Sequence, residues 1–222
     1  MEYKLIRSKR KTLSVSISCG EVTVKAPERM PLAHIEEFLN QKAGWIARKL
    51  AEQEKRNDVF ADVINGNAVL FGGKILPIMP SQKHKRVAVE NGVLCLPEKY
   101  TGDRAAGMRA ITAYYKRLAA NELKAALDVL SARLGLKYAT FSLTNARTKW
   151  GSCDGKCNIM LNWRTVMLDN ETATYIMVHE LAHTVHHDHS AAFWNTVCKY
   201  FPQYKASKKK LKSYSFLTTL YR

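Results

Sequence analysis

The sequence predicts an α+β fold in which strands dominate the first hundred residues and helices dominate the remainder. Residues 12–25 alternate apolar and polar side chains with the period of two that β-strands show, and residues 60–98 contain short apolar runs separated by turn signals. Residues 104–134 repeat apolar side chains every three or four positions, as a helix does. We therefore divide the chain into a β-rich N-terminal lobe with one helix, residues 1–100, and a C-terminal lobe of mixed structure, residues 101–222.

The first lobe contains two hairpin signals with a helix between them. In residues 12–25 the alternation breaks at Gly20, which predicts a hairpin. From Pro31 to about residue 55 the apolar residues follow helical spacing, so we expect a helix there. Asn91 and Gly92 separate two further apolar runs, and this dipeptide is the strongest short-range signal for a second hairpin.

The second lobe begins with the long helix and continues with a strand pair. Gly135 follows the last apolar position of that helix and predicts a left-handed helix end. Residues 139–144 alternate as a strand, and residues 159–163 are expected to be the returning strand. Residues 150–155 form a tight segment that turns the chain between them.

Two more helices and a basic tail complete the second lobe. Residues 171–183 form a predicted helix, for which Asp169 and Asn170 are the candidate caps. Residues 190–200 form a second, shorter helix. The tail after residue 205 is rich in lysine and is expected to be a solvated helix face.

The composition is that of a folded globular protein with an unusually positive charge. Hydrophobic residues make up 46% of the chain, which excludes wholesale disorder, and no apolar run approaches the ~18 residues of a membrane helix. Lys and Arg number 35 against 19 Asp and Glu, and the net charge of +16 attracts polyanions such as nucleic acid or nucleotides.

The first residues lack a secretory apolar segment, and the five cysteines are an odd number. We therefore expect free thiols, a cytoplasmic location and no membrane insertion.

The histidines are concentrated in one short segment, because five of the seven lie between positions 179 and 189. His179 and His183 are four residues apart in a predicted helix, so both imidazoles can reach one metal ion. Glu180 lies about 100° around the helix from His179, which is too oblique for a ligand but suits a base that takes a proton from water on the metal. This H-E-x-x-H pattern predicts a Zn²⁺ site with Glu180 as the general base.

Three histidines are candidates for the third ligand. His186 lies on the same helical stripe, but three ligands from one straight helix rarely surround an ion tetrahedrally. His187 extends the stripe along the helix axis rather than around the metal. His189 lies beyond the expected helix end, where a turn of the chain can bring it back to the ion. We therefore expect His189 to be the third ligand, with water in the fourth position.

Three residues near the strand pair are candidates for substrate binding. Trp150 lies in the tight segment that precedes the metal helix, and it can either line the site or pack in the core. Arg147 can bind a substrate carboxylate or phosphate, or pair with an internal aspartate, and we favour the internal pairing. Asn162 can hydrogen-bond a substrate backbone if residues 159–163 form an edge strand.

A family resemblance rests on four segments that occur together in a fixed order. These are residues 147–153 (RTKWGSC), 161–163 (LNW), 179–183 (HELAH) and 189–194 (HSAAFW). Together they resemble the YgjP-like zinc metallopeptidases, a family similar to the SprT and WLM groups of zincins. The resemblance implies a zincin-like catalytic domain, with His179, His183 and His189 as metal ligands and Glu180 as general base.

The expected function is a zinc-dependent hydrolase, and a metallopeptidase that cleaves peptide or protein substrates is favoured. A UTP pyrophosphatase activity is also attached to the family name and would suit the positive charge. The remaining alternative is a polyanion-binding protein with a structural metal, which a fourth protein ligand would indicate.

Overall fold

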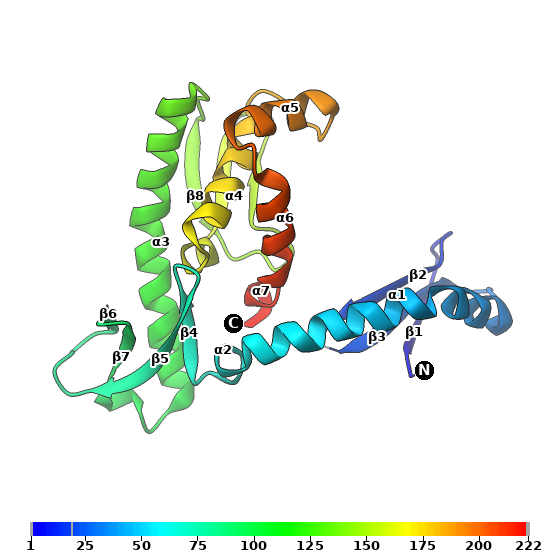
Figure 1. Cartoon of the computed structure of the whole chain (residues 1–222), viewed down its shortest axis with the longest axis horizontal. Helices are drawn as coiled ribbons and strands as arrows, with labels where there is room; N and C mark the ends of the chain where they lie inside the picture. The colour runs from blue at the N-terminus through cyan, green and yellow to red at the C-terminus, as the bar shows by residue number, and fades with distance from the viewer. Residues whose placement is uncertain (1, 19, 221–222) are drawn as a thin grey trace. The chain divides into compact units, whose positions relative to one another are not determined.

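The computed structural model describes residues 2–18 and 20–220. The chain divides into two compact units, Met1–Ala61 and Asp62–Arg222 (Figure 1). The division therefore lies at residue 61 and not near residue 100. The reason is that the second strand region packs on the long helix of the second unit: the buried Tyr115 hydroxyl donates a hydrogen bond to the carbonyl oxygen of Leu70, at 2.8 Å.

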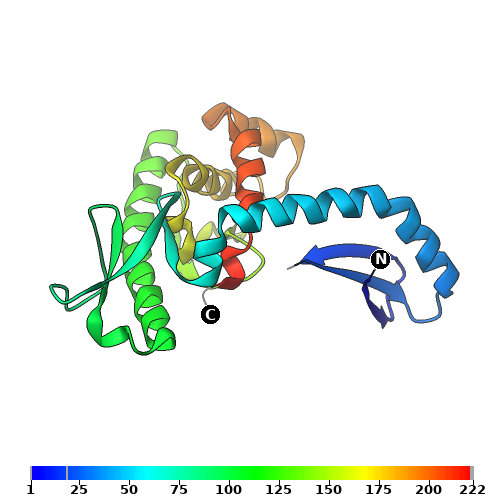
Figure 2. The same ribbon diagram turned by 60° about the horizontal axis from the view of Figure 1, so that its bottom comes forward.

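The first unit is a three-stranded sheet packed on the long helix α1. Figure 2 shows this helix running along the strands. Its elements are β1 (Lys4–Ser8), β2 (Ser14–Ser18), β3 (Glu21–Pro27) and α1 (Leu32–Val59). The antiparallel hairpin β2–β3 and the helix were both predicted, whereas the parallel pairing of β1 with β3 was not. Alternate residues of β3 enter the core, where they meet the apolar stripe of α1: the buried residues are Val22, Val24, Ala26, Ile35, Leu39 and Ile46.

The second unit opens with a four-stranded sheet in the order β4-β5-β7-β6. Its elements are α2 (Ala61–Asn65), β4 (Ala68–Phe71), β5 (Lys74–Ser81), β6 (Ala88–Glu90), β7 (Val93–Pro97) and the 3₁₀ turn η1 (Glu98–Tyr100). The hairpin predicted at Asn91-Gly92 is confirmed as the antiparallel pair β6–β7. Both turn residues have positive φ, 50° and 77°, which Asn and Gly tolerate best.

A second sheet of three strands follows the long helix α3 (Arg104–Leu134), which ends at Gly135 with the predicted left-handed φ of 69°. The strands are β8 (Thr140–Thr144), β9 (Gly151–Cys153) and β10 (Asn158–Asn162). Their order is β8-β10-β9, with β10 parallel to β8 and antiparallel to β9. The predicted strand pair was therefore wrong in two respects: β10 does not return along β8, and part of the tight segment is itself a strand. The loop 145–150 carries the chain from one edge of the sheet to the other.

The last part of the second unit is helical. Its elements are the 3₁₀ turn η2 (Trp163–Met167), α4 (Asn170–Ala182), α5 (Ala191–Tyr200), α6 (Tyr204–Ser213) and α7 (Leu217–Leu220). Both predicted helices are confirmed, and their caps are Asp169 and Ser190, whose side chains accept from the backbone N–H groups of Thr172 and Phe193. In Figure 1, α4 lies between α3 and α6. Within the described ranges 2–18 and 20–220, no helix combines the length and apolar character needed to cross a bilayer.

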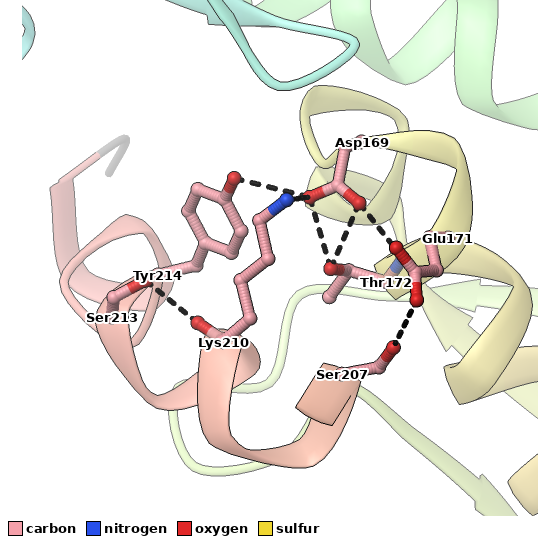
Figure 3. A network of polar contacts seen from close by, with 7 residues as sticks. All are labelled: Asp169, Glu171, Thr172, Ser207, Lys210, Ser213 and Tyr214. Carbon is pink, nitrogen blue, oxygen red and sulfur yellow. Dashed lines mark hydrogen bonds and ion pairs between the residues drawn. The ribbon is translucent and has the colours of Figure 1, made fainter. Parts of the chain in front are cut away.

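A polar network fixes the beginning of α4 against α6 (Figure 3). The carboxylate of Asp169 accepts hydrogen bonds from the backbone N–H and hydroxyl of Thr172, at 2.9–3.1 Å. It also accepts one from the Tyr214 hydroxyl at 3.1 Å and forms an ion pair with Lys210 Nζ at 3.0 Å. On the other side, the turn between β4 and β5 approaches so closely that a Cβ on Gly73 would lie 2.6 Å from that of Asp169. The beginning of α4, the helix that carries the histidine motif, is thus fixed by α6 on one side and by the β4–β5 turn on the other.

Candidate metal centre

Three histidine side chains converge where α4 ends and α5 begins. The apolar residues Ile176, Met177 and Val178 are buried and fix the rotation of α4. His179 lies in the last turn of α4, His183 caps its C-terminus, and His189 lies just before α5.

The three rings are close enough to share one ion. One ligand atom from each ring lies within 4.8 Å of the others, and the Nε2 atoms of His179 and His189 are 3.2 Å apart. The predicted third histidine is therefore the one that the chain brings to the pair.

The hydrogen bonds of the rings suit metal binding. His183 Nδ1 lies 2.9 Å from the carbonyl oxygen of His186, and because a carbonyl can only accept, Nδ1 must carry the proton. The lone pair of His183 is thereby left on Nε2, the usual arrangement for a metal-bound histidine. Nδ1 of His179 is buried without a hydrogen-bond partner among the described residues.

The environment keeps the first two rings neutral. Burial lowers the pKa of His179 to about 3, with smaller contributions from the charges of His183, His189 and Lys208. Burial also lowers the pKa of His183, although its hydrogen bond to the His186 carbonyl acts in the opposite direction. Neutral imidazole is the form that binds metals, so the donor set fits a divalent ion.

The two competing histidines lie elsewhere. Nε2 of His186 is 3.1 Å from the hydroxyl of Thr196 on α5, which holds that ring away from the cluster. His187 is exposed and does not belong to the group of converging ligand atoms. His189, which its spacing from His183 favoured as the third ligand, therefore belongs to the converging group, and metal binding by these residues stays a prediction.

Aromatic rings form one wall of the centre. Phe193 is fully buried and stacks on His183 with a centroid distance of 4.4 Å. Trp194 lies 5.8 Å from the rings of both His179 and His189, and Tyr175 lies 5.9 Å from His179. Sequence reasoning did not single out Phe193 or Tyr175. Phe193 lies three residues after the cap Ser190, and Tyr175 lies one helical turn before His179. These positions were the sequence signal that could have identified them.

Glu180 is buried at the edge of the second sheet, with 5% of its surface exposed. Burial raises the pKa of Glu180 to about 8, and the charge of Lys149 partly opposes that rise. The carboxyl group packs against the backbone of β9 at Gly151, where a Cβ would lie 2.6 Å from Oε1 of Glu180. A group that can hold or release a proton near neutral pH therefore lies one residue from the histidine pair.

The predicted substrate-binding residues have different environments. Asn162 is fully buried, and its amide donates to the carbonyl oxygens of Ala146 and Lys149 at 2.8 and 3.1 Å. The expectation for Asn162 was wrong because β10 is the central strand and its side chain fixes the preceding loop. Trp150 is half-buried beside β9. Arg147 is exposed and forms no ion pair with a described residue, so the favoured internal pairing was wrong.

Asn145, to which the sequence analysis gave no role, also holds this loop. Asn145 Oδ1 accepts hydrogen bonds from Nε1 of Trp163 at 2.9 Å and from Nη1 of Arg164 at 2.8 Å.

The cysteines that the structure describes are free, and Cys19 lies outside the described residues. The free cysteines are Cys95, Cys153, Cys157 and Cys198. Burial raises the pKa of Cys153 to about 12, so it remains a thiol.

Comparison with known proteins places these residues in a family. No curated protein matches the chain. One solved structure, the metallopeptidase zymogen of Pyrococcus abyssi abylysin, is 26% identical over 40% of this chain and 90% of that chain, with a TM-score of 0.37. A family model described as the YgjP-like metallopeptidase domain matches residues 11–214, which include the strands β2 to β10, the H-E-x-x-H helix and His189. The chain belongs to the YgjP-like metallopeptidase family.

Proposed function

We propose that the protein is a zinc-dependent peptidase in which His179, His183 and His189 hold the metal and Glu180 is the general base. The observation that carries this proposal is the convergence of three histidine rings one residue away from a buried glutamate. Three nitrogen ligands leave a fourth position for water, which is the arrangement of catalytic rather than structural zinc sites.

The chemistry divides between the metal and Glu180. Zinc at the three nitrogens would supply the Lewis acid that makes a water molecule acidic near neutral pH. The Glu180 carboxylate would accept the proton of that water at one of its oxygens and then deliver it to the leaving amine. Burial favours the protonated carboxyl group that the second step needs, and a cation held by the histidines would favour the carboxylate that the first step needs.

The second sheet offers a place for an extended peptide. In the part of the chain that the structure describes, β9 pairs with β10 on one side and with no strand on the other. A peptide that adds to such an edge gains backbone hydrogen bonds without regard to its sequence. Because Gly151 of β9 contacts Glu180, a peptide on this edge would pass beside the general base.

The test is metal analysis of the purified protein followed by activity assays on casein, a mixed peptide library and UTP. We expect about one zinc per chain and peptide cleavage that a chelator removes and zinc restores. Zinc-dependent hydrolysis of UTP with no peptide cleavage would assign the centre to phosphoanhydrides instead. Tight zinc binding with neither activity would indicate a structural metal.

A further inference from the structure

A basic hollow lies beside the histidine centre, between α5 and α6. It has a volume of about 390 Å³. Two aromatic residues, Trp194 and Tyr204, form one side, and their rings stack with a centroid distance of 5.3 Å. The other side consists of four exposed lysines, which we call the lysine face: Lys205, Lys208, Lys209 and Lys212.

The lysine face is a consequence of how α6 is anchored. Its residues are spaced i, i+3, i+4 and i+7, so they form one stripe of the helix. The opposite stripe binds α4, through Ser207 and Lys210 on α6 and Tyr214 directly after it, as Figure 3 shows. Lys210 is therefore engaged in the ion pair with Asp169, and the lysine face on the opposite side of the same helix is exposed to solvent.

The charges of the lysine face are not neutralised within the protein. Among the described residues, none of the four lysines forms an ion pair, and the chain has no acidic residue after Asp188. Four like charges on one side of a small hollow repel one another and raise the local concentration of anions. An anionic group bound there would relieve this repulsion.

The lysine face is close to the reacting centre. Lys208 Nζ lies 4.1 Å from the centroid of the Trp194 ring. The same ring lies 5.8 Å from the rings of His179 and His189. The tryptophan thus separates the lysine face from the centre by the thickness of one side chain. An extended peptide advances about 3.3 Å per residue, so side chains within about three residues of the bond at the centre can reach the lysines.

We propose that the lysine face selects peptides that carry an acidic side chain within about three residues of the scissile bond. This inference rests on the proposed peptidase function and specifies its substrate class. The net charge of +16 offers a different explanation for any preference for acidic peptides, namely the diffuse field of the whole protein. A matched pair of variants separates the local effect from the diffuse one.

The first variant replaces Lys205, Lys208, Lys209 and Lys212 with Gln. The control variant replaces four cations of a separate hollow, formed by the β5–β6 loop, η1 and the first half of α3, with Gln: Lys85, Arg86, Lys99 and Arg117. Both variants lose the same number of positive charges, and the two hollows share no residue. Cleavage is measured on paired peptides that differ only by Asp or Asn at each position near the scissile bond.

We expect wild type to prefer the Asp peptides. The ratio of kcat/KM for Asp over Asn peptides should fall about tenfold in the lysine-face variant and remain unchanged in the control. Equal ratios for wild type and the lysine-face variant, or equal losses in both variants, would overturn the proposal.

A measurement of peptide binding tests whether the lysine face recognises acidic peptides without requiring that the protein cleaves them. In a Glu180→Gln background, fluorescence anisotropy of a labelled Asp peptide is followed against salt concentration. We expect tighter binding than for the Asn peptide and a salt dependence that flattens only when the lysine face is neutralised. If wild type cleaves no peptide, the proposed function fails, and this binding difference still decides whether the lysine face recognises acidic peptides. Inorganic phosphate or UTP bound at the lysine face, with no binding of the Asp peptide, would overturn the proposal in favour of a phosphate-bearing ligand.

Discussion

The carboxyl group of Glu180 occupies the space that a side chain on residue 151 would need. A Cβ built on Gly151 would lie 2.6 Å from Oε1, 2.7 Å from Cγ and 2.8 Å from Cδ of Glu180. The φ angle of Gly151 is not in the left-handed region, so space rather than backbone conformation requires glycine. This contact joins the edge strand β9 to the general base of the proposed mechanism.

Gly151→Ala should therefore displace the Glu180 side chain. We expect kcat/KM to fall by about 100-fold, because a shift of about 1 Å at a catalytic group costs that much, with zinc content retained. Overpacking should also lower the free energy of unfolding by about 1–3 kcal/mol. Gly155→Ala is the matched control, since nothing lies within 4 Å of the added methyl group. Similar activities for the two variants would show that the close contact has no catalytic importance.

His189→Ala should lose most of its bound zinc, whereas His187→Ala should keep it. The rings of His179, His183 and His189 converge, while His187 is exposed outside the group. Zinc is measured by elemental analysis after gel filtration, and circular dichroism checks that both variants fold. Equal zinc contents would mean that the third ligand has been assigned incorrectly.

Asp169→Ala should loosen the beginning of α4. The carboxylate caps the helix and bonds to Lys210 and Tyr214, so its loss should lower the free energy of unfolding by about 1–2 kcal/mol at pH 7. Urea unfolding in the presence of a chelator measures this difference without a contribution from zinc. Tyr214→Phe removes one of the hydrogen bonds and should have a smaller effect. An Asp169→Ala variant as stable as wild type at pH 7 would show that the network does not hold the helix.

The same aspartate should make the difference in stability depend on pH. Burial acts to raise the pKa of Asp169, but the hydrogen bonds from Thr172 and Lys210 outweigh it and leave the pKa below its ordinary value of 3.8. A carboxyl group whose pKa is lower in the folded state stabilises the protein above its unfolded pKa, and loses that effect as the pH falls through the folded value. The gap between wild type and Asp169→Ala should therefore be constant from pH 7 to about pH 5 and shrink below about pH 4. A gap that grows on acidification would contradict this sign.

The features that the sequence predicted are those that depend on neighbouring residues. The turn at Asn91-Gly92, the helix end at Gly135 and the cap at Asp169 each follow from residues a few positions apart. The position of His189 belongs to the same class, because a short turn after the motif helix brings it back to His179.

The features that the sequence did not predict arise from contacts between distant segments. The parallel pairing of β10 with β8 has no local signal in the sequence. Because of this pairing, Asn162 lies on the central strand of the sheet and not on the edge strand that we expected. The close approach of Gly151 to Glu180 joins residues on separate elements. The lysine face depends on which stripe of α6 packs against α4, and a lysine-rich segment alone does not reveal this.

The proposed mechanism is best tested by measuring zinc content and hydrolysis on the same preparation of the Glu180→Gln variant. The substitution keeps the size of the side chain and a hydrogen-bonding amide but removes the base. We expect zinc content equal to that of wild type and a loss of activity of about 10²–10⁴-fold, the usual contribution of general-base catalysis. Full activity with zinc bound would show that Glu180 is not the general base.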